Sequence, residues 1–167
     1  MVDLSELLRK RITKEINVGN HHDWILFNYD KTKKPFLFVP IKLYPSLQNT
    51  AMAVGRDPAL VVSFPRNWPW GPPTVTYYDK DIQELYRAGQ LFANDILKLS
   101  DIGCLCCGSI LCRDRWSINR KIQDIVEEFV KITSWRARVV ERFLCKRIQE
   151  NKIGRLPVND YPIFEYL

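Results

Sequence analysis

The chain has 167 residues, of which 46% are hydrophobic and 26% charged, and its formal net charge is +6. This length suits one domain with a sizeable core, so we expect residues 1–167 to form a single domain. No apolar run is long enough to span a bilayer, and residues 1–6 lack the layout of a signal peptide. We therefore expect no membrane partner and a cytoplasmic or nuclear location, where cysteines stay reduced. The positive charge favours an acidic partner surface, but no nucleic-acid-binding signature accompanies it, so nucleic acid is not expected as a partner.

The first predicted element is an amphipathic helix near the N-terminus. Leucine and isoleucine recur at helical intervals from Leu4 to Ile16, and Gly19 is a natural stop. The opposite face of this helix is basic, with Arg9, Lys10, Arg11 and Lys14. The pattern predicts a helix that packs on a core and exposes its basic side to water.

Four β-rich runs follow the helix. They cover residues 24–27, 36–41, 59–64 and 74–78, with turn-forming residues between them. Residues 44–58 contain two prolines and a glycine that argue against regular structure, and residues 79–102 are predicted to be irregular or weakly helical. The spacing of the runs predicts an antiparallel, four-stranded meander.

Helical periodicity returns after the cysteines. One continuous apolar face predicts a helix over residues 118–132, and a further helix is predicted from Ser134 to about Asn151. The order predicts an α+β fold: an N-terminal helix, a four-stranded antiparallel meander, a cysteine-bearing loop and C-terminal helices.

A proline-rich segment lies between the third and fourth β-rich runs. It reads Phe64-Pro65-Arg66-Asn67-Trp68-Pro69-Trp70-Gly71-Pro72-Pro73-Thr74-Val75. Its prolines exclude helix and fix the backbone, so at the least it is a rigid loop wedged on the core. The segment also resembles, at nearly every position, the loop that leads from the third to the fourth strand in ubiquitin-conjugating enzymes, with Trp68 where tyrosine is usual.

The cysteine segment extends this resemblance, which then covers residue 4 to about residue 132. Gly103-Cys104-Leu105-Cys106 is similar to the nucleophile motif of the family, and the usual Ile-Leu pair and Trp-Ser pair follow at residues 110–111 and 116–117. The resemblance implies that Cys106 is the thioester cysteine. A second register would use Cys112, but it leaves too few residues before Trp116, so we prefer Cys106 on spacing.

Two other interpretations of the cysteines remain. Cys104, Cys106, Cys107 and Cys112 could bind zinc through their thiolates, but adjacent cysteines and a Cys-x-Cys step do not give the paired knuckles of structural zinc sites. Apart from the nucleophile, these side chains could equally be buried and inert, because free cysteine packs as a small hydrophobe. We predict no metal and no cofactor.

The resemblance implies a function and a set of partners. Cys106 would receive ubiquitin or a ubiquitin-like protein from an activating enzyme and pass it to a lysine or to a ligase, and Asn94 would support the oxyanion. The activating enzyme would bind the basic face of the first helix, and a ligase would bind Trp70 and the loop formed by Ser117, Ile118 and Asn119.

The residues before Cys106 differ from the family pattern. The family places a His-Pro-Asn motif just before its cysteine, whereas Asn94 stands without His or Pro and 12 residues away from Cys106. A second hypothesis is therefore a catalytically inactive member of the same fold, which would act as a binding module or as a structural component of a larger assembly.

Overall fold

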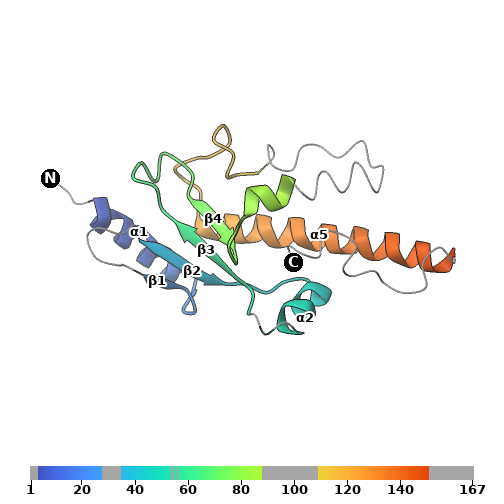
Figure 1. Cartoon of the computed structure of the whole chain (residues 1–167). Coiled ribbons are helices and arrows are strands. Elements are labelled where there is room, and N and C mark those ends of the chain that lie inside the picture. Colours follow the sequence, from blue (N-terminus) through green and yellow to red (C-terminus); the bar gives the residue numbers. More distant parts are fainter. Residues whose placement is uncertain (1–3, 28–34, 54, 56, 88–108, 151–167) are drawn as a thin grey trace.

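The computed structural model of the chain describes residues 4–27, 35–53, 55, 57–87 and 109–150. The protein is α+β, with a sheet of five antiparallel strands in the order β1-β2-β3-β4-β5 (Figure 1). In chain order the elements are α1 (Leu4–Val18), β1 (Ile25–Phe27), β2 (Phe36–Pro40), α2 (Pro45–Ala53), β3 (Ala59–Ser63), β4 (Thr74–Tyr77), β5 (Lys80–Asp81) and α5 (Ile122–Gln149). Residues 82–87 are also helical. No helix in these described ranges is both long enough and apolar enough to cross a membrane.

The sheet buries alternate residues because successive side chains of a strand point to opposite faces. In the middle strand pairs, Leu37 lies opposite Val62, and Val39 lies opposite Leu60. All four of these side chains are fully buried. Their neighbours Phe36 and Phe38 are only partly buried, so one face of the sheet builds the core and the other is more open.

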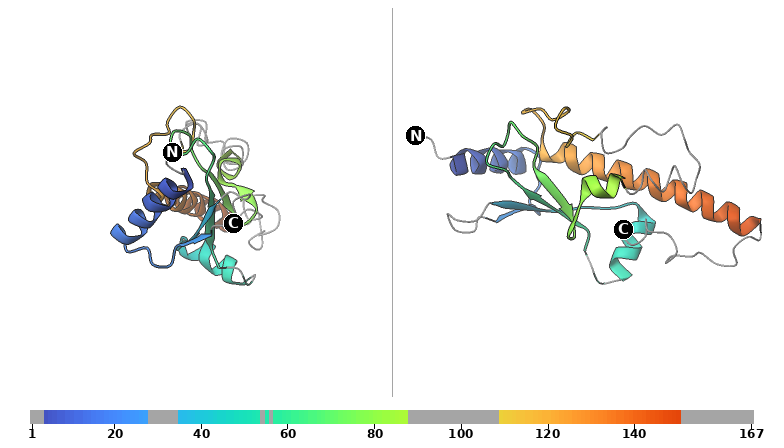
Figure 2. Two further views of the ribbon diagram at one scale, coloured as in Figure 1. Left: turned by 90° about the vertical axis from the view of Figure 1, so that its left-hand side faces the viewer. Right: turned by 45° about the horizontal axis from the view of Figure 1, so that its top comes forward.

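The helix α5 covers the buried face and continues beyond the end of the sheet, as the ribbon views show (Figures 1 and 2). Ile122, Ile125 and Phe129 follow one another at helical spacing, and each is at most 2% exposed. The ring of Phe129 lies 5.3 Å from that of Tyr77 on β4, which joins the helix to the sheet. Leu8 and Ile12 of α1 belong to the same core.

The predicted strands and the first helix agree closely with the structure. The four β-rich runs correspond to β1, β2, β3 and β4 within one or two residues, and the sheet is an antiparallel meander. The strand count differs, because the two-residue β5 adds a fifth strand after a tight turn at Tyr78 and Asp79. Tyr78 occupies the left-handed region, with φ 56°. The turn lacks the asparagine–glycine signal that identifies such hairpins from sequence.

Two other expectations were wrong. Residues 45–53 form α2 because Pro45 stands at the first helical position, where its missing N–H costs nothing, and the later glycine and proline lie beyond the helix end. The predicted break at Ser134 does not occur, and α5 is one helix of 28 residues that begins at Ile122 rather than at residue 118. The hydroxyl of Thr133 donates to the carbonyl of Phe129 at 2.8 Å. Because this polar side chain bonds to the backbone of its own helix, the helix continues through Thr133 and Ser134.

Candidate functional site: the proline loop, the cysteine-bearing segment and α1

The proline loop between β3 and β4 directs its two tryptophans in opposite directions. Trp68 is 6% exposed and its ring meets Phe64 edge-on at 5.2 Å, so it anchors the loop in the core. Trp70, two residues later, is 69% exposed. The peptide bond between Trp68 and Pro69 is cis. The loop is therefore fixed on the inside by one indole while it presents another to solvent.

A hydrogen bond joins this loop to the segment that precedes α5. The indole N–H of Trp116 donates to the carbonyl of Pro69 at 2.7 Å, across 47 residues of sequence. Trp70 follows Pro69, and Ile118 lies two residues after Trp116, so the bond brings together two chain segments that each expose a large apolar side chain. Ile118 is 47% exposed. We call the exposed residues Trp70, Ser117, Ile118 and Asn119 the Trp70 surface.

Arg11 of α1 is a structural link between α1 and this segment. Its guanidinium donates to the carbonyl of Ile118, and to the carbonyl of Arg120 at 3.2 Å. The same group lies 4.7 Å from the centre of the Trp68 ring, within the range of a cation–π contact. Of the four basic residues predicted on the docking face of the first helix, Arg11 is thus partly buried and bonded to other parts of the protein.

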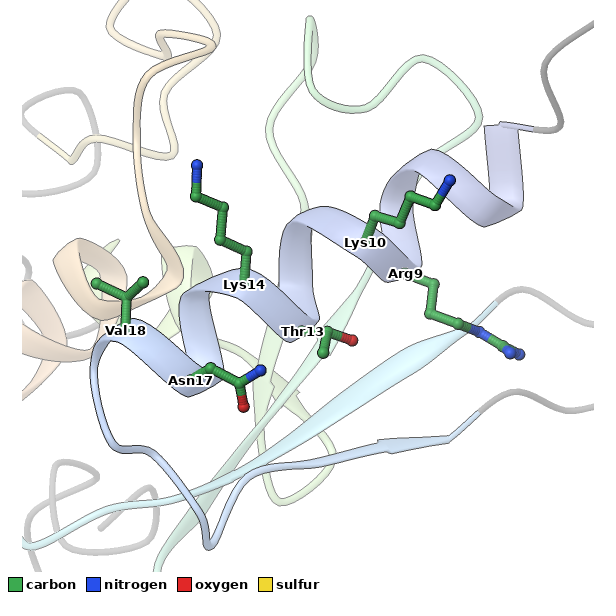
Figure 3. Close-up of a pocket in the computed structure, with 6 residues that line it drawn as sticks. All are labelled: Arg9, Lys10, Thr13, Lys14, Asn17 and Val18. Carbon is green, nitrogen blue, oxygen red and sulfur yellow. The ribbon is translucent and has the colours of Figure 1, made fainter.

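The other three, Arg9, Lys10 and Lys14, are exposed. They line a shallow hollow of about 450 Å³ along α1, together with Thr13, Asn17 and Val18 (Figure 3). Lys10, Lys14 and Val18 follow one another at intervals of four residues, so they stand along one side of the helix (Figure 3). Lys10 also pairs with Glu6 at 2.8 Å, one turn earlier, which leaves Arg9 and Lys14 as the stronger cationic positions of this face.

The part of the cysteine-bearing segment that the structure describes begins at Ser109 and is held on α5 by one carboxylate. Ser109 is 1% exposed, and its hydroxyl donates to Oε1 of Glu128 at 2.5 Å. The backbone N–H of Ile110 donates to Oε2 of Glu128 at 2.9 Å. Glu128 therefore satisfies two donors of the turn that leads to Cys112. Sequence reasoning did not single out Glu128, because its partners lie 18 and 19 residues away and no spacing rule connects them.

Cys112, the second candidate nucleophile, lies in the same turn. Its thiol is half-buried and free. Its carbonyl accepts from the backbone N–H groups of Arg115 and Trp116 at 2.8 and 2.9 Å, so the residue shapes the turn that positions Trp116. Arg113 and Arg115 beside it are exposed.

The preferred nucleophile Cys106 and the proposed oxyanion donor Asn94 lie outside the described residues, as do Cys104 and Cys107. Among the residues that are described, no group of three His, Cys, Asp or Glu side chains could hold a metal ion. The chain matches no protein-family model, no curated protein and no solved structure.

Proposed function

We propose that the chain is a divergent ubiquitin-conjugating enzyme, which carries ubiquitin or a ubiquitin-like protein as a thioester on Cys106. The observation that supports this best is the contact of the Trp116 indole with Pro69, since it connects the two segments whose sequences resemble that family. The order of elements supports it as well: a helix with an exposed basic side, an antiparallel meander, a rigid proline loop and a cysteine-bearing segment that leads into a long helix.

The chemistry consists of two acyl transfers. In the first, the Cys106 thiolate attacks the carbonyl carbon of the modifier's thioester on the activating enzyme, a new S–C bond forms, and the activating enzyme's thiolate leaves. In the second, a lysine amine attacks the Cys106 thioester, an amide forms, Cys106 leaves as a thiolate, and the amine loses a proton. Each step passes through an oxyanion, and a preorganised donor such as Asn94 can stabilise it by about 3 kcal/mol.

The exposed surfaces suggest where the partners bind. Arg9, Lys10 and Lys14 stand in water along α1 and would attract an acidic face of the activating enzyme. The Trp70 surface offers two large apolar side chains beside polar ones, which is the composition of a protein-docking site. Neither surface requires the thiol, so a member of this fold without catalysis could still use both as a binding module.

A charging assay separates these functions. The protein is incubated with an activating enzyme, ATP and ubiquitin, and separately with ubiquitin-like modifiers and their own activating enzymes, and is then run on non-reducing gels. We expect a band that dithiothreitol removes. Cys106→Ala should abolish it, Cys106→Ser should replace it with a band that resists dithiothreitol, and Cys112→Ala should leave it.

Two outcomes would contradict the proposal in different ways. If Cys112→Ala removes the band and Cys106→Ala does not, the thioester forms on Cys112, and the assignment of Cys106 as the nucleophile is wrong. If the wild type charges with no modifier while it stays folded, conjugation is excluded for those modifiers and the binding-module hypothesis is preferred. The double variant Arg9→Glu/Lys14→Glu should slow loading at low salt, whereas Lys42→Glu/Lys131→Glu, with the same change in net charge at two exposed positions, should not.

A further inference from the structure

A second hollow adjoins the first along the edge that Lys14 and Val18 form, and it lies between the C-terminal half of α1 and the residues that lead into α5. Its volume is about 660 Å³, within the range of about 300–1,000 Å³ that is typical of ligand pockets. It is lined by the end of α1, the turn at Gly19 and His21, and residues on both sides of Lys121. We call this hollow the α1–α5 groove.

Long-range contacts fix the two sides of the groove relative to each other. Arg11 donates to the carbonyls of Ile118 and Arg120. Four residues further along α1, the carboxylate of Glu15 accepts from the backbone N–H of Gln123 at 3.0 Å. These contacts span 107 to 109 residues of sequence, so the groove is built before any partner arrives. A preformed site loses less conformational entropy on binding than one that must be ordered.

The charge of the groove is positive. Arg11, Lys14 and Lys121 line it, against one carboxylate, Glu15, which already accepts a hydrogen bond from the start of α5. Lys14 and Lys121 are both exposed, and among the described residues the structure gives neither of them an ion pair. At the start of α5 the carboxylates of Asp124 and Glu15 already accept from the backbone N–H groups of Lys121 and Gln123, so the charge available to a ligand comes from the lysine side chains. A ligand with carboxylates would therefore find two available ammonium groups here.

The rim of the groove is apolar. Val18 is 73% exposed and Ile118 is 47% exposed, and both line it. Branched apolar side chains at the edge of a basic groove suit a peptide that carries both carboxylates and an apolar residue. A nucleic acid would instead be expected to meet stacking aromatic rings along a basic track, and the described lining contains only the imidazole of His21, which already stacks on Trp24 at 4.0 Å.

We propose that the α1–α5 groove binds an acidic peptide segment in which carboxylates flank a branched apolar side chain. The carboxylates pair with Lys14 and Lys121, and the apolar side chain packs between Val18 and Ile118. The site differs from the hollow lined by Arg9 and Lys10, although Lys14 and Val18 border both, and it shares Ile118 and Asn119 with the Trp70 surface. It does not depend on thioester chemistry, so it would also exist in a protein that never becomes charged.

Fluorescence anisotropy with the full chain carrying Cys106→Ala tests the proposal without any contribution from conjugation. The probe is a fluorescein-labelled peptide, Asp-Glu-Leu-Glu-Asp. We expect saturable binding that weakens about tenfold when the two lysines are neutralised in Lys14→Gln/Lys121→Gln. The matched double variant Lys42→Gln/Lys131→Gln removes the same charge from exposed positions outside the groove and should bind as the parent does.

Two further comparisons examine the apolar contact and the class of ligand. Val18→Ser should weaken binding several-fold, whereas Met52→Ser, at an exposed position on α2, should not. A peptide with serine in place of leucine should bind more weakly than the original. The proposal is overturned if the two double-lysine variants weaken binding equally, if neither weakens it, or if no saturable binding occurs. It is also overturned if an oligothymidylate of equal charge competes as well as the peptide does.

Discussion

Two arginine side chains, Arg11 and Arg136, donate to backbone carbonyls in surroundings that differ. Arg11 reaches the carbonyls of Ile118 and Arg120 from the partly exposed side of α1. Arg136 of α5 is 4% exposed and donates to the carbonyls of Leu85 and Tyr86, the latter at 2.9 Å. Water can replace Arg11 at its carbonyls, but it has little access to those beside Arg136. The comparison indicates that Arg136 secures the fold, whereas Arg11 sets the geometry of a surface.

Burial also changes the ionisation of the inner group. Loss of solvent around the guanidinium lowers the pKa of Arg136 to about 10, so it remains charged at neutral pH. Burial raises the pKa of the neighbouring Tyr86 hydroxyl, and the charge of Glu128 adds to that rise. Arg136 is therefore a buried cation that faces carbonyl groups at the C-terminal end of the short helix 82–87. A positive charge is favourable there because the C-terminal end of a helix carries partial negative charge.

The largest effect should follow from Arg136→Met. Methionine fills part of the same space but donates no hydrogen bond, so two buried carbonyls lose their partner, and we expect a loss of about 2–4 kcal/mol in the free energy of unfolding. Urea denaturation measures it, with Arg138→Met, at an exposed position on the same helix, as the control. A loss below about 1 kcal/mol would break the comparison, because such carbonyls would then be satisfied without the arginine.

Glu128→Ala should have the next largest effect. It leaves the buried Ser109 hydroxyl and the Ile110 N–H without their acceptor, which we expect to cost about 2 kcal/mol. Glu127→Ala, one residue earlier, removes only an exposed contact with Gln123 and should change stability by less than about 0.5 kcal/mol. Equal losses in the two variants would mean that Glu128 does not hold the turn.

Arg11→Met tests the outer half of the comparison. We expect a loss of about 1 kcal/mol or less, because water can satisfy the carbonyls of Ile118 and Arg120 once the guanidinium is gone. The local effect should be larger than the global one: amide hydrogen exchange at residues 116–121 should speed up, while that of β2 and β3 should stay as in the wild type. Arg9→Met, on the exposed side of the same helix, is the control. A global loss as large as that of Arg136→Met would contradict the distinction.

The smallest effect concerns pH. Burial raises the pKa of Glu15 above its usual value, against the opposing influence of its hydrogen bonds to the start of α5. The folded protein therefore holds this proton more tightly than the unfolded chain. The resulting stabilisation is present below the unfolded pKa of about 4.5 and is lost as the pH rises through the folded value.

Glu15→Gln, which keeps an acceptor for Gln123, should remove this part of the pH dependence. As the pH rises from 4 to about 7, the wild type should lose stability relative to the variant, measured as the free energy of unfolding of each protein. A difference that does not change with pH, or that shifts toward the wild type, would show that burial does not dominate at Glu15.

The sequence predicts the apolar part of the structure well and the polar part poorly. Alternation in β2 and β3 and helical spacing from Ile122 to Phe129 are local patterns, so they place the strands and the buried face of α5 correctly. Arg136 and Glu128 bond to partners 18 to 51 residues away. Such contacts depend on how the elements pack against each other, so no local sequence pattern predicts them.

The same reasoning applies to the site. Exposure of Trp70, Ser117, Ile118 and Asn119 agrees with a docking role, and three of the four basic residues assigned to α1 are exposed. The fourth, Arg11, is partly buried because it contacts Trp68 and the carbonyl of Ile118, which lie near it only in the folded protein. The α1–α5 groove could not be predicted from the sequence, since Lys14 and Lys121 are far apart in the chain. The roles of Cys106 and Asn94 remain predictions.

The uninterrupted course of α5 constrains how its sequence can change in length. Gln123, Glu128 and Arg136 fasten the helix to α1, to the turn at Ser109 and to the carbonyl of Leu85. A rise of about 1.5 Å per residue places the first and last of these about 20 Å apart on one rod. One residue inserted or deleted between them would rotate the rest of the helix by about 100° and shift it along its axis by about 1.5 Å. All three attachments could not then be met together, so this stretch tolerates substitution far better than a change in length.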